Sequence, residues 1–138
     1  VAVWTSAVAN GGTVVTPKLV NSIEDAKTKK LTWPKNKTSK VAVSAGNMKI
    51  VKQGMGECVS YGSCGLLQYL PVSAGGKTGT AQWNDNDKQN HAWFTSFAPY
   101  KNPEIVVTVL IEEGEGGATT AQPVARDFLN WWGKRYVE

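Results

Sequence analysis

The stretch HAWFTSFAPYKNPEIVVTVLIEEG, residues 91–114, decides the fold. Residues 91–100 and 105–111 are rich in aromatic and β-branched side chains, and the polar residues 101–104 separate them, a pattern typical of an antiparallel hairpin. The second run is apolar at almost every position, which predicts a central strand covered on both faces. The stretch GGKTGTAQ, residues 75–82, supplies a third strand, and the Asn- and Asp-rich residues 83–90 predict an exposed turn before the hairpin.

A first helix is predicted from Val1, Trp4 and Val8, which recur at helical spacing before the stop signal Asn10-Gly11-Gly12. Its start is uncapped, because no Ser, Thr, Asp or Asn precedes the first apolar residue. We therefore expect the natural polypeptide to continue upstream of Val1.

Two further helices are predicted. The first follows Ser44 as its cap and carries apolar residues at positions 48, 51, 55 and 59, although glycines at 54 and 56 weaken the pattern in its second half. The last helix is expected to begin at Thr120 as its cap, with Pro123 in its first turn. Its predicted buried side consists of Val124, Phe128, Leu129 and Trp132.

Residues 13–43 contain only weak strand signals. Residues 13–23 predict one irregular strand near a sheet edge, and residues 31–33 and 41–43 predict a weak hairpin around a lysine-rich loop. Residues 27–40 hold six lysines but lack the aromatic interleaving of an RNA-binding surface, which favours a solvated loop over a nucleic-acid site. Between Gly62 and Pro71 we expect a loop or a short turn of helix.

The order of these elements predicts an α+β fold, with an antiparallel sheet of three C-terminal strands flanked by helices. The chain has 138 residues, of which 41% are hydrophobic and 19% charged, enough for one ordinary core and too few for two. Residues 1–138 therefore form one globular unit or part of one. No apolar run reaches the roughly 18 residues of a membrane span, and no signal-peptide pattern opens the chain, so any export signal or anchor is expected outside it.

The two cysteines, Cys58 and Cys64, are separated by five residues, and the single histidine, His91, is distant in sequence, which is no zinc signature. The pair either closes a small disulfide loop, worth on the order of 2 kcal/mol, or remains as two free, buried cysteines. The sequence leaves both alternatives open.

The motif Lys77-Thr78-Gly79-Thr80 is a small, cationic, hydroxyl-bearing strand suited to holding a substrate carboxylate. The K-T-G triplet accompanies an S-x-x-K nucleophile and an S-x-N type motif in penicillin-binding proteins and class A β-lactamases. Neither companion occurs, because none of the eight serines has a lysine three positions on or an asparagine two positions on. Taken alone, the triplet fits equally well an edge strand that uses lysine against aggregation and glycine for a bulge.

Four segments together resemble a known family. ANGGTVVTPKLV at 9–20, GGKTGTAQ at 75–82, the hairpin at 91–114 and the closing helix look like the C-terminal half of a class B penicillin-binding protein transpeptidase domain, penicillin-binding protein 2-like in its turn FAPYKNPE. The resemblance implies a β-lactamase/transpeptidase-like fold and a peptidoglycan D,D-transpeptidase that cross-links cell-wall peptides through a serine acyl-enzyme and binds penicillin. The family's nucleophile and S-x-N motif would lie upstream of Val1, and residues 56–65 match nothing that we can assign.

The resemblance also implies roles for the motif. The backbone N–H of Thr80 would donate to the oxyanion, and the hydroxyls of Thr78 and Thr80 would hold the terminal carboxylate of a D-alanyl peptide or of a β-lactam. Lys77 would attract that carboxylate and bias proton transfer among the upstream groups, while Gly79 lets the substrate backbone lie flat against the strand. Lys77 and Thr80 are thus the catalytic candidates, and Thr78, Gly79 and Thr80 the substrate-binding ones; no metal or cofactor is expected.

Other polar and aromatic residues carry weaker expectations. His91 opens a strand, which favours a packed or capped histidine over a catalytic one, and Trp83 fits either the acceptor side of the cleft or a plain surface position. Tyr100-Lys101-Asn102 imitates a Y-x-N motif, but its place in a hairpin turn makes it a coincidence. The remaining tryptophans are expected in the core or in helix packing: Trp4, Trp33, Trp93, Trp131 and Trp132.

Two hypotheses of function stay open. In the first, the chain is the C-terminal segment of a transpeptidase, inactive without the upstream half of the same domain. One edge of strand 105–111 would then be bare and open to strand-mediated dimerisation. In the second, it is a non-catalytic module of the same fold that binds D-Ala-D-Ala peptides or β-lactams, or an interaction module. The resemblance places the protein on the extracytoplasmic side of the membrane, in the periplasm or at the cell surface, with any anchor outside this chain.

Overall fold

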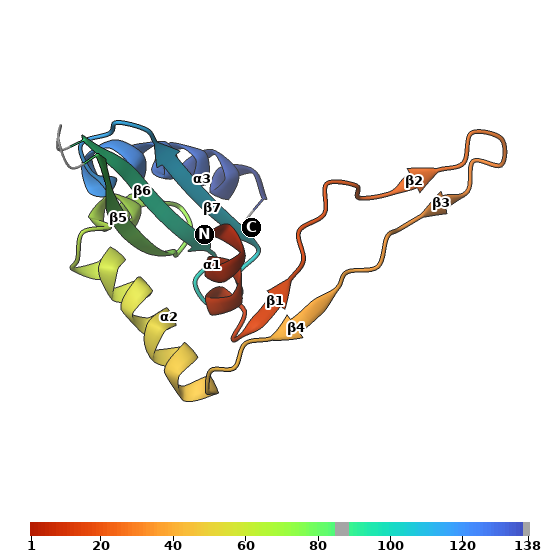
Figure 1. The fold of residues 1–138 in the computed structure, drawn as a ribbon, viewed down its shortest axis with the longest axis horizontal. Helices are drawn as coiled ribbons and strands as arrows, with labels where there is room; N and C mark the ends of the chain where they lie inside the picture. The colour runs from red at the N-terminus through yellow and green to blue at the C-terminus, as the bar shows by residue number, and fades with distance from the viewer. Residues whose placement is uncertain (85–88, 137–138) are drawn as a thin grey trace.

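The computed structural model describes residues 1–84 and 89–136. A compact body holds a three-stranded sheet and the helices, and a long β arm projects from it (Figure 1). The elements follow in the order α1 (Ala2–Ala9), β1 (Thr13–Val15), β2 (Ile23–Glu24), β3 (Leu31–Thr32), β4 (Thr38–Lys40), α2 (Ala45–Ser60), η1 (Gly65–Tyr69), β5 (Gly75–Asn84), β6 (Gln89–Ala98), β7 (Ile105–Ile111), η2 (Gly117–Ala121) and α3 (Gln122–Tyr136). The predicted α+β class, with an antiparallel sheet of C-terminal strands flanked by helices, is confirmed.

The sheet of the body has the antiparallel order β5-β6-β7. Gly75 pairs with Phe97 at one end of the β5–β6 ladder, and Ala98 pairs with Ile105 at the start of the β6–β7 ladder. The central strand is therefore β6, and the prediction that residues 105–111 form the central strand was wrong. Of the turn predicted at 83–90, residues 83–84 belong to β5 and residues 89–90 to β6; the rest of that prediction lies outside the described residues.

Helices cover both faces of this sheet. Neighbouring residues of β6 point to opposite faces, and Phe94 lies in a core cluster with Ala125 and Leu129 of α3, whereas Phe97 lies in a second cluster with Ala9 of α1 and Met55 of α2. Because both α1 and α3 also contact β7, its continuous apolar run is explained by coverage of its two faces. That coverage does not require a central position in the sheet.

The helix α2 begins as predicted. The Ser44 hydroxyl accepts a hydrogen bond from the Asn47 backbone N–H at 3.2 Å, and the helix continues through Gly54 and Gly56 to Ser60. Its buried residues include Met48, Met55 and Val59, as the spacing predicted, whereas Val51 is exposed.

The helix α3 differs from its prediction in start and in phase. A π-helical turn, η2, precedes it, so Thr120 lies inside that turn and is not the cap. Leu129 and Trp132 are buried as predicted, but Val124 and Phe128 are 49% and 42% exposed, so their assignment to the buried side was wrong. The small residues Ala125 and Gly133 occupy the buried face instead, because α3 packs closely enough for a Cβ on Gly133 to lie 3.0 Å from Val72.

The β arm consists of two short antiparallel ladders. β1 pairs with β4 from Thr13↔Lys40 to Val15↔Thr38, and β2 pairs with β3 from Ile23↔Thr32 to Glu24↔Leu31. The single strand predicted at 13–23 is therefore two strands, and the predicted hairpin between 31–33 and 41–43 was wrong. The lysines of 27–40 are all exposed, as expected for a solvated segment. Figure 1 shows β2 and β3 at the far end of the arm.

The tryptophans divide between the core and the surface. Trp132 is buried and Trp93 is half-buried, in agreement with the prediction. Trp4, Trp33 and Trp131 are each at least half exposed, so the prediction of core or packing positions was wrong for them. In the described part of the chain, no helix combines the length and the apolar character that a membrane crossing requires.

Candidate functional site

The motif Lys77-Thr78-Gly79-Thr80 lies in β5, at the edge of the sheet. Lys77 pairs with Thr95 and Thr80 with Ala92 on β6, and no other strand of the described residues pairs with β5. An edge strand presents every second backbone N–H and C=O away from its partner. The motif therefore offers unpaired backbone donors along the open side of β5, beside its own hydroxyls.

A cavity of about 620 Å³ lies along this motif. One wall consists of the four motif residues, and the other is the segment from Glu115 to Thr119, which contains the start of η2. Gly116 and Gly117 let this segment approach closely: a Cβ on Gly117 would lie 2.6 Å from the Gly79 carbonyl oxygen, and one on Gly116 would lie 3.8 Å from Oγ1 of Thr80. The second wall thus rests directly on the backbone of the motif.

No pattern in the sequence predicts this second wall. Residues 112–117 lie between the predicted strand 105–111 and the predicted last helix, and nothing in their spacing points to β5. The glycine pair Gly116-Gly117 is the signal that was available, since adjacent glycines before a helix often allow a close backbone approach.

The motif's side chains leave β5 toward opposite faces, because neighbours on a strand alternate. Lys77 also lines a largely apolar hollow of about 530 Å³ with Trp4, Val51 and Met55, on the face of α1 and α2. Its Nζ donates a hydrogen bond to the Thr78 carbonyl oxygen at 2.6 Å. Lys77 therefore belongs to the walls of both hollows.

Thr78 is half-buried, and its hydroxyl lies 2.9 Å from the Ser63 hydroxyl. Ser63 precedes Cys64, which forms a disulfide with Cys58. The structure thus decides between the two alternatives that the sequence left open for the cysteines. It also brings the unassigned residues 56–65 to the motif, a contact that no sequence spacing indicated.

The other candidate residues have structural roles. His91 accepts a hydrogen bond on Nδ1 from the Glu113 backbone N–H at 3.2 Å, and its ring stacks on Trp83 with centroids 5.5 Å apart, which confirms the packed histidine. Trp83 is 53% exposed and lies outside the residues that line the motif's cavity. Tyr100 stacks on Phe97 and donates to the Lys52 carbonyl oxygen, away from the motif, so its resemblance to a Y-x-N motif is a coincidence as predicted.

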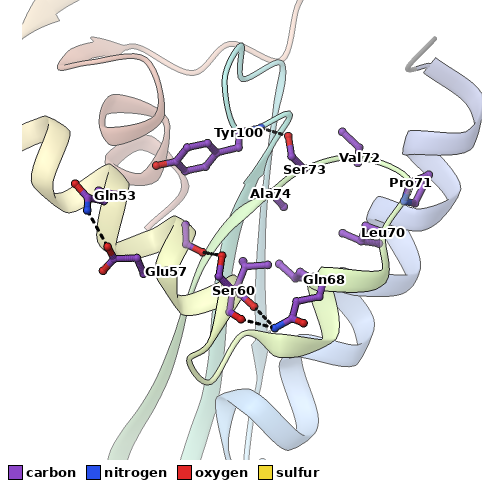
Figure 2. Close-up of a pocket in the computed structure, with 13 residues that line it drawn as sticks. Gln53, Glu57, Ser60, Gln68, Leu70, Pro71, Val72, Ser73, Ala74 and Tyr100 are labelled. Carbon is purple, nitrogen blue, oxygen red and sulfur yellow. Dashed lines mark hydrogen bonds between the residues drawn. The ribbon is translucent and has the colours of Figure 1, made fainter.

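A third hollow, of about 680 Å³, lies between α2, η1 and the segment that leads into β5 (Figure 2). Its polar side chains are already used by the fold. Nε2 of Gln68 donates to the carbonyl oxygens of Val59 and Ser60 at 2.7 and 2.8 Å, and Nε2 of Gln53 donates to Glu57 at 2.8 Å. Gln68 thereby satisfies backbone carbonyl groups in the last turn of α2. The polar side chains of this hollow therefore stabilise the packing of the fold and are already engaged in hydrogen bonds.

The charged groups of the body give no sign of a metal centre. Within residues 1–84 and 89–136, no three or more His, Cys, Asp or Glu side chains form a group that could hold a metal ion.

Burial lowers the pKa of Lys52. Its Nζ donates a hydrogen bond to the Ala9 carbonyl oxygen at 2.8 Å and lies over the Phe97 ring, so this lysine caps the C-terminal end of α1.

Comparison with known proteins agrees with this geometry. A family model described as the penicillin binding protein transpeptidase domain matches residues 1–130. Peptidoglycan D,D-transpeptidase MrdA of Haemophilus influenzae is 35% identical over 152 aligned positions, which cover 96% of this chain and 23% of that protein. This chain thus spans about a quarter of the length of that relative.

Solved structures give the same result. The D,D-transpeptidase domain of a peptidoglycan glycosyltransferase from Eggerthella lenta superposes with a TM-score of 0.82 at 27% identity, over 99% of this chain and 32% of that one. Penicillin-binding protein A from M. tuberculosis, as an imipenem acyl-enzyme complex, superposes with a TM-score of 0.77 at 28% identity, over 91% of this chain and 28% of that one. The match over residues 1–130, the sheet order and the K-T-G edge strand together show that this chain belongs to the penicillin-binding protein transpeptidase domain family.

Proposed function

We propose that this chain forms the substrate-binding wall of a serine D,D-transpeptidase that cross-links peptidoglycan stem peptides and is acylated by β-lactams. The observation that carries the proposal is the position of Lys77-Thr78-Gly79-Thr80 on an open sheet edge, facing a cavity of about 620 Å³ whose other wall is the segment 115–119. The names of the relatives support it: one is a peptidoglycan D,D-transpeptidase and one is seen as an imipenem acyl-enzyme.

In this proposal, the hydroxyls of Thr78 and Thr80 hold the terminal carboxylate of a D-alanyl-D-alanine peptide. The two residues are two positions apart on β5, so their side chains leave on the same face. The Lys77 ammonium supplies the positive charge at the same edge. A short cationic strand of this kind stabilises the carboxylate by charge-assisted hydrogen bonds, which are about twice as strong as neutral ones.

The acyl transfer itself uses a serine hydroxyl, which attacks the penultimate carbonyl and expels D-alanine as the amine takes up a proton. An amine of a second stem peptide then attacks the ester, and the serine is released. In both steps the backbone N–H of Thr80 donates to the oxyanion, a contribution of roughly 3–4 kcal/mol per donor in comparable enzymes. Because no serine of the 138 residues belongs to an S-x-x-K motif, the nucleophile is supplied from outside this chain.

The partner in this proposal is therefore the upstream half of the same domain. The outer edge of β7 is free of strand pairing within the described residues, and it offers backbone groups to a further strand. That strand comes from the upstream half, or from a second copy when this chain is isolated. The substrate places the assembly on the extracytoplasmic side, and the disulfide fits an oxidising compartment.

Intact mass after incubation with a fluorescent penicillin tests the proposal. The isolated chain is expected to carry no adduct, and the complete gene product that contains these residues is expected to carry one acyl group. A Thr80→Val variant of the complete product should be acylated more slowly than a Thr32→Val variant, because Thr32 lies far out on the arm. A stable adduct on the isolated chain, or no adduct on the complete product, would contradict the proposal.

A further inference from the structure

The loop between Cys58 and Cys64 is fixed at both of its ends. The disulfide joins the two cysteines, whose Cα atoms are 5.0 Å apart. The backbone N–H groups of Gly62 and Cys64 both donate to the Cys58 carbonyl oxygen, at 3.1 and 2.9 Å. Ser63 lies between these two donors, so its backbone position is set by the closed loop.

The same loop rests on β5. Cys64 is fully buried, and a Cβ on Gly76 would lie 3.3 Å from its sulfur. The disulfide therefore packs against the strand one residue before Lys77. From this base, the Ser63 hydroxyl reaches the Thr78 hydroxyl at 2.9 Å, a short distance for two oxygen atoms that share one hydrogen bond.

The direction of this hydrogen bond matters for a ligand. Each hydroxyl has one proton to donate. The Cys58 sulfur, 3.5 Å from the Ser63 oxygen, carries no proton in the disulfide and is a weak acceptor. The Thr78 oxygen is thus the better acceptor for the Ser63 proton. When Ser63 donates to Thr78, the proton of Thr78 is left to donate elsewhere, into the cavity that this residue lines.

We infer that Ser63, held in place by the Cys58–Cys64 disulfide loop, is a positioning residue that turns the Thr78 hydroxyl into a donor toward an anionic ligand group. The inference rests on the proposed function, since the anion is the carboxylate of a D-alanyl peptide or of a β-lactam. It assigns a role to residues 56–65, which the family resemblance left unexplained. Ser63 acts through Thr78 and does not contact the reacting atoms.

The test compares two probes on the complete gene product: penicillin G, which has a carboxylate, and its methyl ester, which lacks the charge. The measured quantity is the ratio of the second-order acylation rate constants, acid over ester. Loss of one ordinary hydrogen bond corresponds to about a 2- to 12-fold change. We expect Ser63→Ala to lower the ratio by about that factor, and Ser63→Thr, which keeps a hydroxyl, to restore it.

This ratio separates positioning from general damage to the fold. If Ser63→Ala slows both probes equally, or leaves the ratio unchanged while the wild-type product is acylated normally, the inference is wrong and the proposed function stands. If the wild-type product is not acylated by either probe, the proposed function fails first. Ser63 is exposed, so its substitution by alanine is expected to change the free energy of unfolding by less than about 0.5 kcal/mol.

A second arm tests the part played by the disulfide. Dithiothreitol reduces it to two thiols and is itself oxidised to a cyclic disulfide. In the wild type, reduction should lower the acid-over-ester ratio in the same direction as Ser63→Ala. In the Ser63→Ala variant, reduction should cause no further drop, because the residue that transmits the effect is gone. An equal drop in both proteins would show that the loop acts without Ser63 and would overturn the inference.

Discussion

Alanine substitution at two neighbouring glycines gives a sharp test of how η2 is seated on the K-T-G strand. A Cβ on Gly117 would lie nearest to the Trp93 carbonyl oxygen of β6, and 2.6 Å from the carbonyl oxygen and 2.8 Å from the nitrogen of Gly79; all of these are backbone atoms. A Cβ on Gly116 meets only Oγ1 of Thr119 at 3.5 Å and Oγ1 of Thr80 at 3.8 Å, which is ordinary contact. The two variants therefore make the same chemical change, with opposite steric results.

The size of the effect follows from the overlap. To bring the contact with the Gly79 carbonyl oxygen alone from 2.6 Å to the 3.4 Å at which ordinary contact begins, η2 must move away from the sheet by at least about 0.8 Å, and the nearer Trp93 carbonyl oxygen of β6 demands more. Overpacking of this kind costs about 1–3 kcal/mol. The gain of about 0.4–1 kcal/mol from a less flexible unfolded chain is common to both variants. We expect Gly117→Ala to be less stable than Gly116→Ala by about 1–3 kcal/mol.

The assays are urea unfolding of both variants and acylation of the complete gene product by penicillin. A misplacement of about 1 Å at a reacting site can cost about 100-fold in rate, so Gly117→Ala should slow acylation by about 10- to 100-fold relative to Gly116→Ala. If the free energies of unfolding of the two variants differ by less than about 0.5 kcal/mol, η2 does not rest on Gly79 and the second wall of the cavity has been misassigned.

Three further predictions follow from other parts of the molecule. Phe94→Ala should lower the free energy of unfolding by about 3–5 kcal/mol in urea, because Phe94 is fully buried; the half-exposed Phe128 is the matched control, with a much smaller loss. Hydrogen bonds from the Thr28 backbone N–H, the Thr28 hydroxyl and the Lys27 backbone N–H hold the pKa of the Asp25 carboxyl below its usual value. The stabilisation of the arm's tip by these bonds is thus present above the usual pKa of Asp and disappears as the pH falls through the lowered one. In an NMR titration the Asp25 resonances should move at lower pH than those of a Thr28→Ala variant. Light scattering of the isolated chain should show concentration-dependent dimers through the free edge of β7, and a clean monomer at high concentration would contradict that pairing.

The sheet shows what local patterns can and cannot predict. The three C-terminal strands and the 101–104 turn were predicted because alternation and turn residues act over a few positions. The order of the strands was not, since the apolar run of β7 reflects contact with α1 on one face and α3 on the other. An edge strand and a central strand show the same apolar sequence pattern when each is covered on both faces.

The prediction of the start and the buried side of α3 was wrong for a related reason. The prediction placed the large apolar residues Val124 and Phe128 on the buried side, yet the buried face contains Ala125 and Gly133, because α3 packs closely on Val72 in the segment before β5. The π-helical turn before the helix also replaced the expected cap at Thr120. The close contact of α3 depends on tertiary packing, and neither it nor the π-helical turn leaves a periodic pattern in the sequence.

The candidate site was predicted in part. The motif in β5 was found from its residue types and its family resemblance. The wall formed by Gly116 and Gly117 and the contact from Ser63 come from segments far from the motif in sequence. Contacts of that kind are set by tertiary packing, and a single sequence holds no periodic signal for them.

Two separate requirements explain the glycines of GGKTGT, residues 75–80: access of the substrate and packing against β6. Substrate access accounts for Gly79 only in part, because a Cβ there would already lie 3.2 Å from Cβ of Trp93. A Cβ on Gly75 would lie 2.6 Å from the Phe97 ring, and one on Gly76 would lie 3.0 Å from the Phe94 ring. The glycines thus let the aromatic residues of β6 fill both faces of the sheet beneath the motif. The hydroxyls of Thr78 and Thr80 and the ammonium group of Lys77 lie at the open edge of β5. The strand can therefore be rigid where it packs against β6 and polar where it faces a ligand.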